Sequence, residues 1–138
     1  MTGSRSPHAL INPPELGPAV GFTHVVAAFP GRLVHVAGQI ASNADGSVVG
    51  ESLAEQFDVA LANVVTALAA AGCRPDHTVS ILVFTTSMDE YRRSRREIGA
   101  AWRNHFGRHF PAVALVGVAV LYEPTAKVEI VTWAVVPD

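Results

Sequence analysis

The clearest periodic pattern of apolar side chains lies in the first half of the chain, and it predicts a helix. Ser52, followed three residues later by Glu55, forms a capping box that opens this helix. Gly72 stands where a C-terminal cap belongs. Apolar side chains recur three or four residues apart between them, on one helical face: Leu53, Phe57, Leu61, Val64 and Leu68.

Apolar and β-branched runs predict strands on both sides of this helix. The expected strands are residues 22–29, 33–37, 78–86, 113–121 and 126–136. Pro30-Gly31 is a turn signal between the first two, so these are expected to pair as a hairpin. An amphipathic, arginine-rich segment from Asp89 to His105 predicts a second helix, which Gly107 ends.

The resulting order, β-β-α-β-α-β-β, predicts an α+β fold with a mixed, mostly antiparallel sheet and both helices on one face. The other face of the sheet would carry much apolar surface, and no segment is left to cover it. We therefore expect an oligomer. Residues 1–14 are rich in helix and strand breakers and are expected to form a flexible tail, with residues 15–138 as a single domain.

Composition limits the class of protein. A chain of 138 residues, 49% apolar and 16% charged, suits one soluble globular domain. No apolar run reaches the roughly 18 residues that span a bilayer, and the N-terminus lacks a signal-peptide pattern. Cys73 is the only cysteine, which excludes an internal disulfide and a cysteine-rich zinc site. We expect a cytoplasmic protein that does not act at a membrane.

Other chemical motifs are missing from the chain. No histidine pair has metal-ligand spacing, because Gly107 separates His105 from His109. No GxSxG elbow and no glycine-rich phosphate loop occur. Cys73, beside the helix-capping Gly72, has no obvious cationic partner and is interpreted as inert. We expect neither a metal nor another cofactor.

Basic residues are unevenly distributed, although the net charge of −2 gives no general attraction to nucleic acid. Six of the ten lie in one short stretch: Arg92, Arg93, Arg95, Arg96, Arg103 and Arg108. No set of aromatic residues is interleaved with them, as a single-strand binder would require. We interpret the cluster as a solvated helix face rather than a nucleic-acid surface.

Several landmarks, in this order and spacing, resemble the YjgF/Rid family over about residues 15–136. They are Gly17-Pro18, Val36-Ala37-Gly38-Gln39, the helix pattern of residues 61–72, Phe110-Pro111-Ala112 and Val128-Glu129-Ile130. The resemblance implies a chorismate-mutase-like fold and a homotrimer whose sheets pack together as a barrel. It also implies that small molecules bind in clefts between subunits. Such a trimer would cover the apolar face of the sheet.

The chain departs from this family at two positions. In the best-known group, which hydrolyses 2-imino acids, an arginine follows Pro-Ala and grips the substrate carboxylate. Here Val113 follows Pro111-Ala112, and Ala19 replaces the family's tyrosine after Gly-Pro. Both changes argue against the usual 2-imino acid substrate.

Glu129 is the candidate catalytic residue. Side chains alternate along a strand, so Glu129 shares its face with Val131, Trp133 and Val135. A carboxylate on an apolar face is suited to general acid–base chemistry or to positioning a water molecule. The resemblance implies the water-positioning role. The alternative is a glutamate that is exposed at the start of the strand or paired with an arginine.

The resemblance also implies a set of ligand-binding residues. Backbone at Gly38 and Leu115 would line the cleft, and backbone contacts survive changes of side chain. Arg95 or Arg96 falls near a helix position that faces the cleft in relatives and would replace the missing arginine; the alternative is a solvated arginine. The expected set is Gly38, Val113, Ala114, Leu115, Arg95 and Arg96.

Three functions remain open on the sequence. The first is a trimeric hydrolase or deaminase that acts on a small enamine, imine or related intermediate, with Glu129 guiding water. The second is a non-catalytic trimer that binds a small molecule in the same cleft. The third is RNA cleavage or inhibition of translation, a label that some relatives carry, which only the arginine-rich helix supports.

Overall fold

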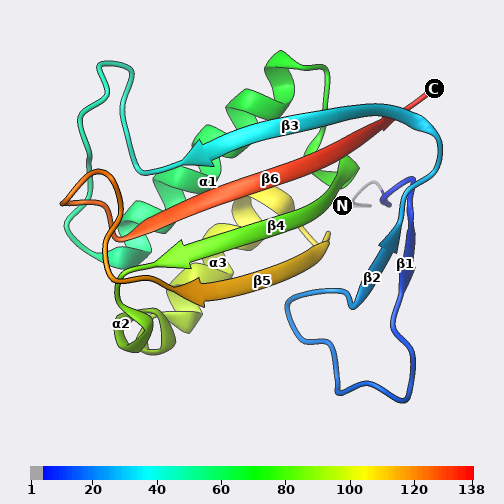
Figure 1. The fold of residues 1–138 in the computed structure, drawn as a ribbon, viewed down its shortest axis with the longest axis horizontal. Helices are drawn as coiled ribbons and strands as arrows, with labels where there is room; N and C mark the ends of the chain where they lie inside the picture. The colour runs from blue at the N-terminus through cyan, green and yellow to red at the C-terminus, as the bar shows by residue number, and fades with distance from the viewer. Residues whose placement is uncertain (1–4) are drawn as a thin grey trace.

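A computed structural model describes residues 5–138, and Figure 1 shows a sheet in front of a layer of helices. In chain order the elements are β1 (Ala9–Ile11), β2 (Val25–Ala27), β3 (Gly31–Gln39), α1 (Leu53–Ala70), the 3₁₀ helix η1 (Pro75–His77), β4 (Thr78–Thr85), α2 (Met88–Arg93), α3 (Arg95–Phe106), β5 (Ala112–Gly117) and β6 (Val128–Pro137). The main sheet has the order β3-β6-β4-β5. β4 and β5 are parallel and the other pairs are antiparallel. The predicted α+β fold, a mixed sheet with helices on one face, is confirmed.

The first helix begins and ends as its pattern predicts. The Ser52 hydroxyl accepts a hydrogen bond from the backbone N–H of Glu55, at 3.1 Å. Beyond the last turn, Gly72 has φ of +76°, a left-handed conformation that favours glycine. The five apolar residues of the predicted face are at most 1% exposed. α1 therefore anchors the helical layer on the sheet.

By length and composition, α1 is also the one helix within residues 5–138 that would suffice to cross a membrane. Core helices of globular domains meet the same criterion. Its apolar face packs here against β3, β6 and α3. Its role in this structure is therefore that of a core helix.

The hairpin predicted between residues 22–29 and 33–37 is wrong. β2 pairs with β1, and β3 pairs with β6 along most of its length. A Cβ on Gly31 would lie 2.1 Å from the carbonyl oxygen of Val136, so this glycine permits close approach of β6 and does not form a hairpin turn. Pairing with the ten-residue β6 buries Val34 and Val36 of β3 against the helices, which the three-residue β2 could not do.

The segment predicted to be a flexible tail, residues 1–14, contains a strand. Residues 1–4 lie outside the described part of the chain, but Ala9–Ile11 form β1. His8 is buried: its Nε2 donates to the carbonyl of Val135, at 2.9 Å, and its Nδ1 accepts from the N–H of Phe29, at 3.2 Å. The folded region therefore begins before residue 15. Side-chain bonds from a histidine hold this segment, and a local sequence pattern does not reveal them.

The second predicted helix, Asp89 to His105, is divided in two at Ser94. The Ser94 backbone has φ of −99° and ψ of 13°, and its N–H donates to the carbonyls of both Glu90 and Tyr91. The break allows α2 to meet the start of α1, where the carboxylate of Glu90 accepts from the N–H of Leu53 at 3.2 Å. α3 then packs along α1. The last two strands also differ from their predicted bounds, since β5 ends at Gly117 and β6 begins at Val128.

Several buried polar side chains gather where β4 begins. His109 Nε2 donates to the carbonyl of Thr78, at 2.8 Å, and no described residue donates to or accepts from its buried Nδ1. Burial is the largest cause that lowers the pKa of His109, and it also lowers the pKa of His77. Nearby His8 lowers both pKa values further, whereas Asp76 opposes the shift. Both imidazoles are therefore neutral in the native state at neutral pH.

These histidines predict a loss of stability in mild acid. Their native pKa values lie below the unfolded value of about 6.5, so the unfolded state binds protons first. The contribution to stability is complete above about pH 6.5 and is lost as the pH falls toward the native pKa values. Urea unfolding at pH 7.5 and 5.5 should show this loss, and His109→Gln should reduce it while retaining a donor toward Thr78. Equal losses in both proteins would contradict this account of His109.

Candidate functional site

The residues predicted to form one site lie on two faces of the sheet. Val113 pairs with Ile81, whose side chain is buried under the helices, so Val113 and Leu115 face the helical layer. Glu129 is opposite Phe84 on the other face. Ala114 lies on that open face too, and is exposed. Within one chain, the structure therefore separates the predicted catalytic residue from Val113 and Leu115.

Glu129 and Gly38 form the first group, which we call the carboxylate half-site. The register of β3 against β6 shifts between Val36 and Gln39, as in a β-bulge, and brings Gly38 over Glu129. A Cβ on Gly38 would lie 2.5 Å from Glu129 Oε1 and 2.7 Å from its Cδ. The glycine leaves space for the carboxyl group, which occupies the position of the missing side chain.

The Glu129 side chain is half-buried beside apolar neighbours. Phe84 lies opposite it on β4, and Val131 and Trp133 follow on the same face of β6. Within residues 5–138, no arginine forms an ion pair with Glu129 and no donor forms a hydrogen bond with its carboxylate. The alternative of an arginine-paired glutamate is therefore not observed. The carboxylate retains its capacity to accept hydrogen bonds from water or a ligand.

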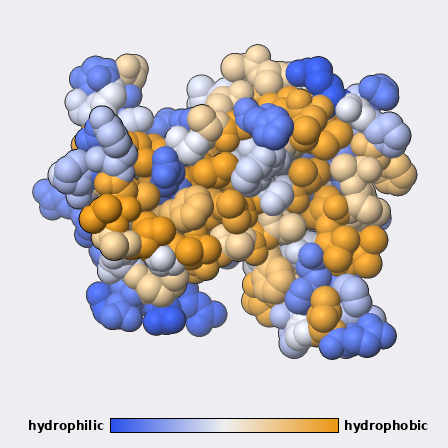
Figure 2. All heavy atoms as spheres, in the orientation of Figure 1, coloured by the Kyte–Doolittle hydropathy of each residue, from blue (hydrophilic) through white to orange (hydrophobic). Residues whose placement is uncertain are grey.

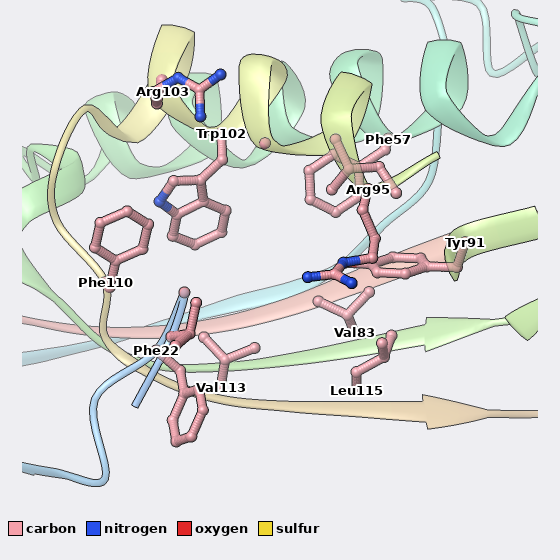
Figure 3. A pocket seen from close by; sticks show the side chains of 14 residues that line it. Phe22, Phe57, Val83, Tyr91, Arg95, Trp102, Arg103, Phe110, Val113 and Leu115 are labelled. Carbon is pink, nitrogen blue, oxygen red and sulfur yellow. The ribbon is translucent and has the colours of Figure 1, made fainter. Parts of the chain in front are cut away.

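The second group lines a cavity of about 610 Å³ between β5, α3 and the segment before β2. Figure 3 shows side chains from these elements converging on it. Its lining residues are Val20, Gly21, Phe22, Phe57, Val83, Tyr91, Arg95, Ile98, Gly99, Trp102, Arg103, Phe110, Val113 and Leu115. This volume is within the range of roughly 300–1,000 Å³ that is typical of small-molecule sites.

Aromatic rings form much of the cavity wall and are held by packing. Trp102 stacks on Phe110 with ring centroids 6.1 Å apart, and its indole N–H donates to the carbonyl of His109, at 3.0 Å. Phe57 meets Tyr91 edge to face, with ring centroids 6.1 Å apart. Burial raises the pKa of Tyr91 to about 12, so its hydroxyl is neutral at physiological pH. The aromatic part of the wall is therefore pre-formed and uncharged.

Arg95 lines the cavity and Arg96 does not, although both side chains are exposed. In Figure 3 the Arg95 guanidinium lies beside the ring of Tyr91 and above Val83. The ion pairs found within residues 5–138 leave Arg95 without a carboxylate partner. Of the two candidates for a replacement arginine, Arg95 is therefore the one that lines the same cavity as Val113.

The sequence interpretation did not find the aromatic wall or the N-terminal contribution to it. The helical pattern places Phe57 in the core, and Phe110 belongs to the Phe110-Pro111-Ala112 landmark. No sequence pattern marks either of them, or Trp102, as part of a cavity wall. The N–H of Thr23 donates to the carbonyl of Pro111, at 3.0 Å, and this bond holds Val20 and Phe22 against the cavity. One signal was available: Ala19, the altered family position, immediately precedes this segment.

Other reactive residues are accounted for elsewhere. His105 pairs with Asp58 of α1, at 2.8 Å, and His109 is buried. Burial raises the pKa of the Cys73 thiol, which keeps it protonated and unreactive at neutral pH. No group of three histidine, cysteine or acidic side chains suited to a metal ion occurs in the part of the chain that the structure describes.

The open face of the sheet is apolar, as predicted. Figure 2 shows hydrophobic surface extending across the strands that face the viewer in Figure 1. Leu33 is 57% exposed and Val116 42% exposed, at opposite edges of this face. The two halves of the predicted site also lie toward opposite edges of the sheet, because Gly38 is on edge strand β3 and Val113 is on edge strand β5.

The fold and the two half-sites define a class of small α+β proteins that use a mixed sheet with one open apolar face. The family model described as endoribonuclease L-PSP matches residues 13–136. The chain is similar to the Rid family protein YyfB from Yersinia pestis, with 31% identity, a TM-score of 0.85 and coverage of 94% of this chain and 98% of that one. It therefore belongs to the YjgF/Rid family, as its landmarks indicated.

Two further relatives agree with this membership. The mitochondrial protein MMF1 of Saccharomyces cerevisiae is 30% identical over 107 residues, which are 78% of this chain and 71% of MMF1. Rv2704 of Mycobacterium tuberculosis, a member of the YjgF/YER057c/UK114 family, is 29% identical. Its TM-score is 0.62, with coverage of 94% of this chain and 99% of that one. The shared fold thus extends over nearly the whole chain.

Two glycines at close approaches should respond differently to alanine. In Gly38→Ala the atoms in the way belong to the flexible end of Glu129, which can swing aside; in Gly31→Ala they belong to the backbone of Val136. We expect Gly31→Ala to lower the free energy of unfolding by about 1–3 kcal/mol, as other overpacked sites do, and Gly38→Ala to lower it much less. Urea unfolding measures both.

The control is Gly17→Ala, because a Cβ at Gly17 would meet nothing within 4 Å. A crystal structure of Gly38→Ala should show the Glu129 carboxylate displaced from its present position. An unmoved carboxylate, or a Gly38→Ala protein as unstable as Gly31→Ala, would refute this view of the carboxylate half-site.

Proposed function

We propose that this protein is a Rid-like hydrolase or deaminase that acts on a small enamine, imine or related reactive intermediate in a cleft between two copies of the chain. The observation that carries the proposal is the Glu129 carboxylate, which lies over Gly38 on an apolar face without a partner among the described residues. Such a carboxylate is available to a water molecule. A neighbouring cavity would then have to supply the substrate.

The cleft would form between opposite edges of the sheet. The family resemblance implies a homotrimer with clefts between subunits, and in our proposal β5 of one copy would lie near β3 of the next. That arrangement would bring the cavity of one copy toward the carboxylate half-site of another, which a single chain keeps apart. The apolar open face supports the assembly, because monomeric proteins rarely expose so continuous a patch.

The chemistry is hydrolysis of a carbon–nitrogen double bond. Glu129 would accept a hydrogen bond from water and take its proton as the water oxygen bonds to the imine carbon. That proton passes to nitrogen, which gives a carbinolamine. Its hydroxyl group then loses its proton to nitrogen through Glu129 as the carbon–nitrogen bond breaks, and a carbonyl compound and ammonia are released. An enamine would enter the same route after its carbon is protonated to give the imine.

The usual 2-imino acid is disfavoured as substrate. The position that would carry its carboxylate clamp is Val113, which forms part of the apolar cavity wall beside Leu115. Val113 has no donor in its side chain to bind an anion. A substrate of this site must therefore be held in another way.

Two other functions use the same features differently. A non-catalytic small-molecule binder is favoured by the pre-formed cavity and would show ligand binding without turnover. RNA cleavage, suggested by the family's description as endoribonuclease L-PSP, has the exposed arginines of α2 and α3 as its support. RNA cleavage that disappears when Arg92, Arg93, Arg95 and Arg96 are all neutralised would favour this third function over the first.

The catalytic proposal predicts the effect of one substitution. Ammonia release should be followed with a panel of small imines, both 2-imino acids generated from amino acids and uncharged imines, in wild type, Glu129→Gln and Glu97→Gln. Glu129→Gln should lower kcat by about 10²–10⁴-fold, the usual contribution of a general acid–base group. Glu97, exposed on α3, is the matched control and should have no effect. Undiminished ammonia release by Glu129→Gln would remove Glu129 from the mechanism.

The assembly predicts a particle of three times the chain mass of 14.6 kDa in sedimentation. Leu33→Glu places a charge on the exposed apolar face of β3 and should dissociate the particle, since an unpaired charge is costly to bury. Thr66→Glu, on the exposed side of α1, should leave it intact. A wild-type monomer would contradict the trimer and the cleft that depends on it.

A further inference from the structure

The polar and apolar groups of the cavity are arranged along α3. Arg95 and Trp102 are seven residues apart, which places them on one face of the helix and about 10 Å apart along its axis. Ile98 and Gly99 occupy the turn between them and also line the cavity. The cavity therefore has Arg95 at one end and the rings of Trp102 and Phe110 at the other, where Arg103 also lines the wall (Figure 3).

Arg95 lacks the carboxylate partner that two nearby basic residues have. Arg92 pairs with Asp89, at 3.5 Å, and Lys127 pairs with Glu90, at 3.1 Å. Arg95 pairs with none of the described carboxylates, although its guanidinium lies beside the cavity wall (Figure 3). Tyr91 next to it is neutral, because burial raises its pKa to about 12. An anion entering the cavity would thus meet an uncompensated positive charge.

Gly99 is a second feature that points to an occupant. Glycine is among the least favourable residues in the interior of a helix, and Gly99 lies near the middle of α3 without a positive φ that would require it. A Cβ there would meet only Arg103 Nη1 within 4 Å, at 3.4 Å. Packing within the chain does not exclude a larger residue, and a side chain here would occupy space in the cavity that Gly99 lines.

We propose that this cavity binds a small anionic molecule with an aromatic or similarly bulky apolar body. Arg95 would hold the anionic group, and Trp102 and Phe110 would receive the ring, with Gly99 leaving space between them. Arg95 thus takes over from a different element the task that Val113 cannot perform. That this molecule is the substrate rests on the proposed function, but its binding in the cavity does not.

Three matched probes test the two ends of the cavity separately: 3-phenylpropionate, propionate and 3-phenylpropanamide. The first has both charge and ring, the second lacks the ring, and the third lacks the charge. Isothermal titration calorimetry should show 3-phenylpropionate binding at least about tenfold tighter than either of the others, by analogy with other charge-assisted contacts. Equal binding of all three, or no binding of 3-phenylpropionate, would overturn the proposal.

Variants on α3 identify the residues responsible. Arg95→Gln should reduce the affinity for 3-phenylpropionate to that for the amide, and leave the amide unchanged. Arg96→Gln, at the neighbouring exposed position, should bind as wild type. Gly99→Leu should abolish binding of both phenyl compounds while retaining or raising the Tm, because leucine favours the helix. Unchanged binding by Arg95→Gln would refute the anion site.

Two tryptophans report the location of binding. In ¹⁵N NMR spectra the indole signal of Trp102 should shift on addition of 3-phenylpropionate, whereas that of Trp133, on the open face of the sheet, should not. A shift of Trp133 alone would place the ligand elsewhere and refute the cavity as its site.

Glu129→Gln distinguishes failure of this proposal from failure of the proposed function. It should bind 3-phenylpropionate as wild type does. Binding in the cavity without ammonia release from any imine by the wild type would retain the ligand class and reject the hydrolase. Ammonia release that depends on Glu129, without binding of 3-phenylpropionate, would retain the hydrolase and reject the ligand class.

Discussion

The pairing of β6 with two neighbours is the constraint on which the rest of the structure depends. β6 lies between β3 and β4 and alternates in environment from Val128 to Ala134. Val128, Ile130, Thr132 and Ala134 are buried under the helices, and the residues between them face the open side. A shift of one residue would exchange the two faces, bury Glu129 in the core and expose Ile130. The register thus positions the core and the candidate catalytic carboxylate together.

The same sheet order explains why the candidate site is divided. Two interior strands separate Gly38 on one edge from Val113 on the other, so neither half can serve the other within a chain. Exposed edges and an apolar open face both favour association, and a closed ring of copies would satisfy both. The valine at position 113 therefore removes an anion-binding side chain from the cavity half of the site only. The carboxylate half-site depends on the contact between Gly38 and Glu129, in which residue 113 takes no part.

Local patterns predicted the elements that depend on local interactions. Both ends of helix α1 were predicted, because Ser52 and Gly72 cap the helix through interactions within one turn of the chain. The hairpin at Pro30-Gly31 and the uninterrupted second helix were wrong because long-range partners decided them. β6 offered β3 a longer ladder than β2, and the break at Ser94 allows α2 and α3 to meet α1 at different points.

For the candidate site, the sequence by itself determined family membership, the strand that carries Glu129 and the absence of an anion-binding side chain at Val113. These follow from the order of residues and the two-residue period of a strand. Only the tertiary structure decided that Glu129 and Val113 face opposite sides of the sheet, and that Arg95 rather than Arg96 reaches the cavity. The physical reason is that a cavity is the space left between packed elements, so its walls combine residues such as Phe22 and Trp102 that are far apart in the chain.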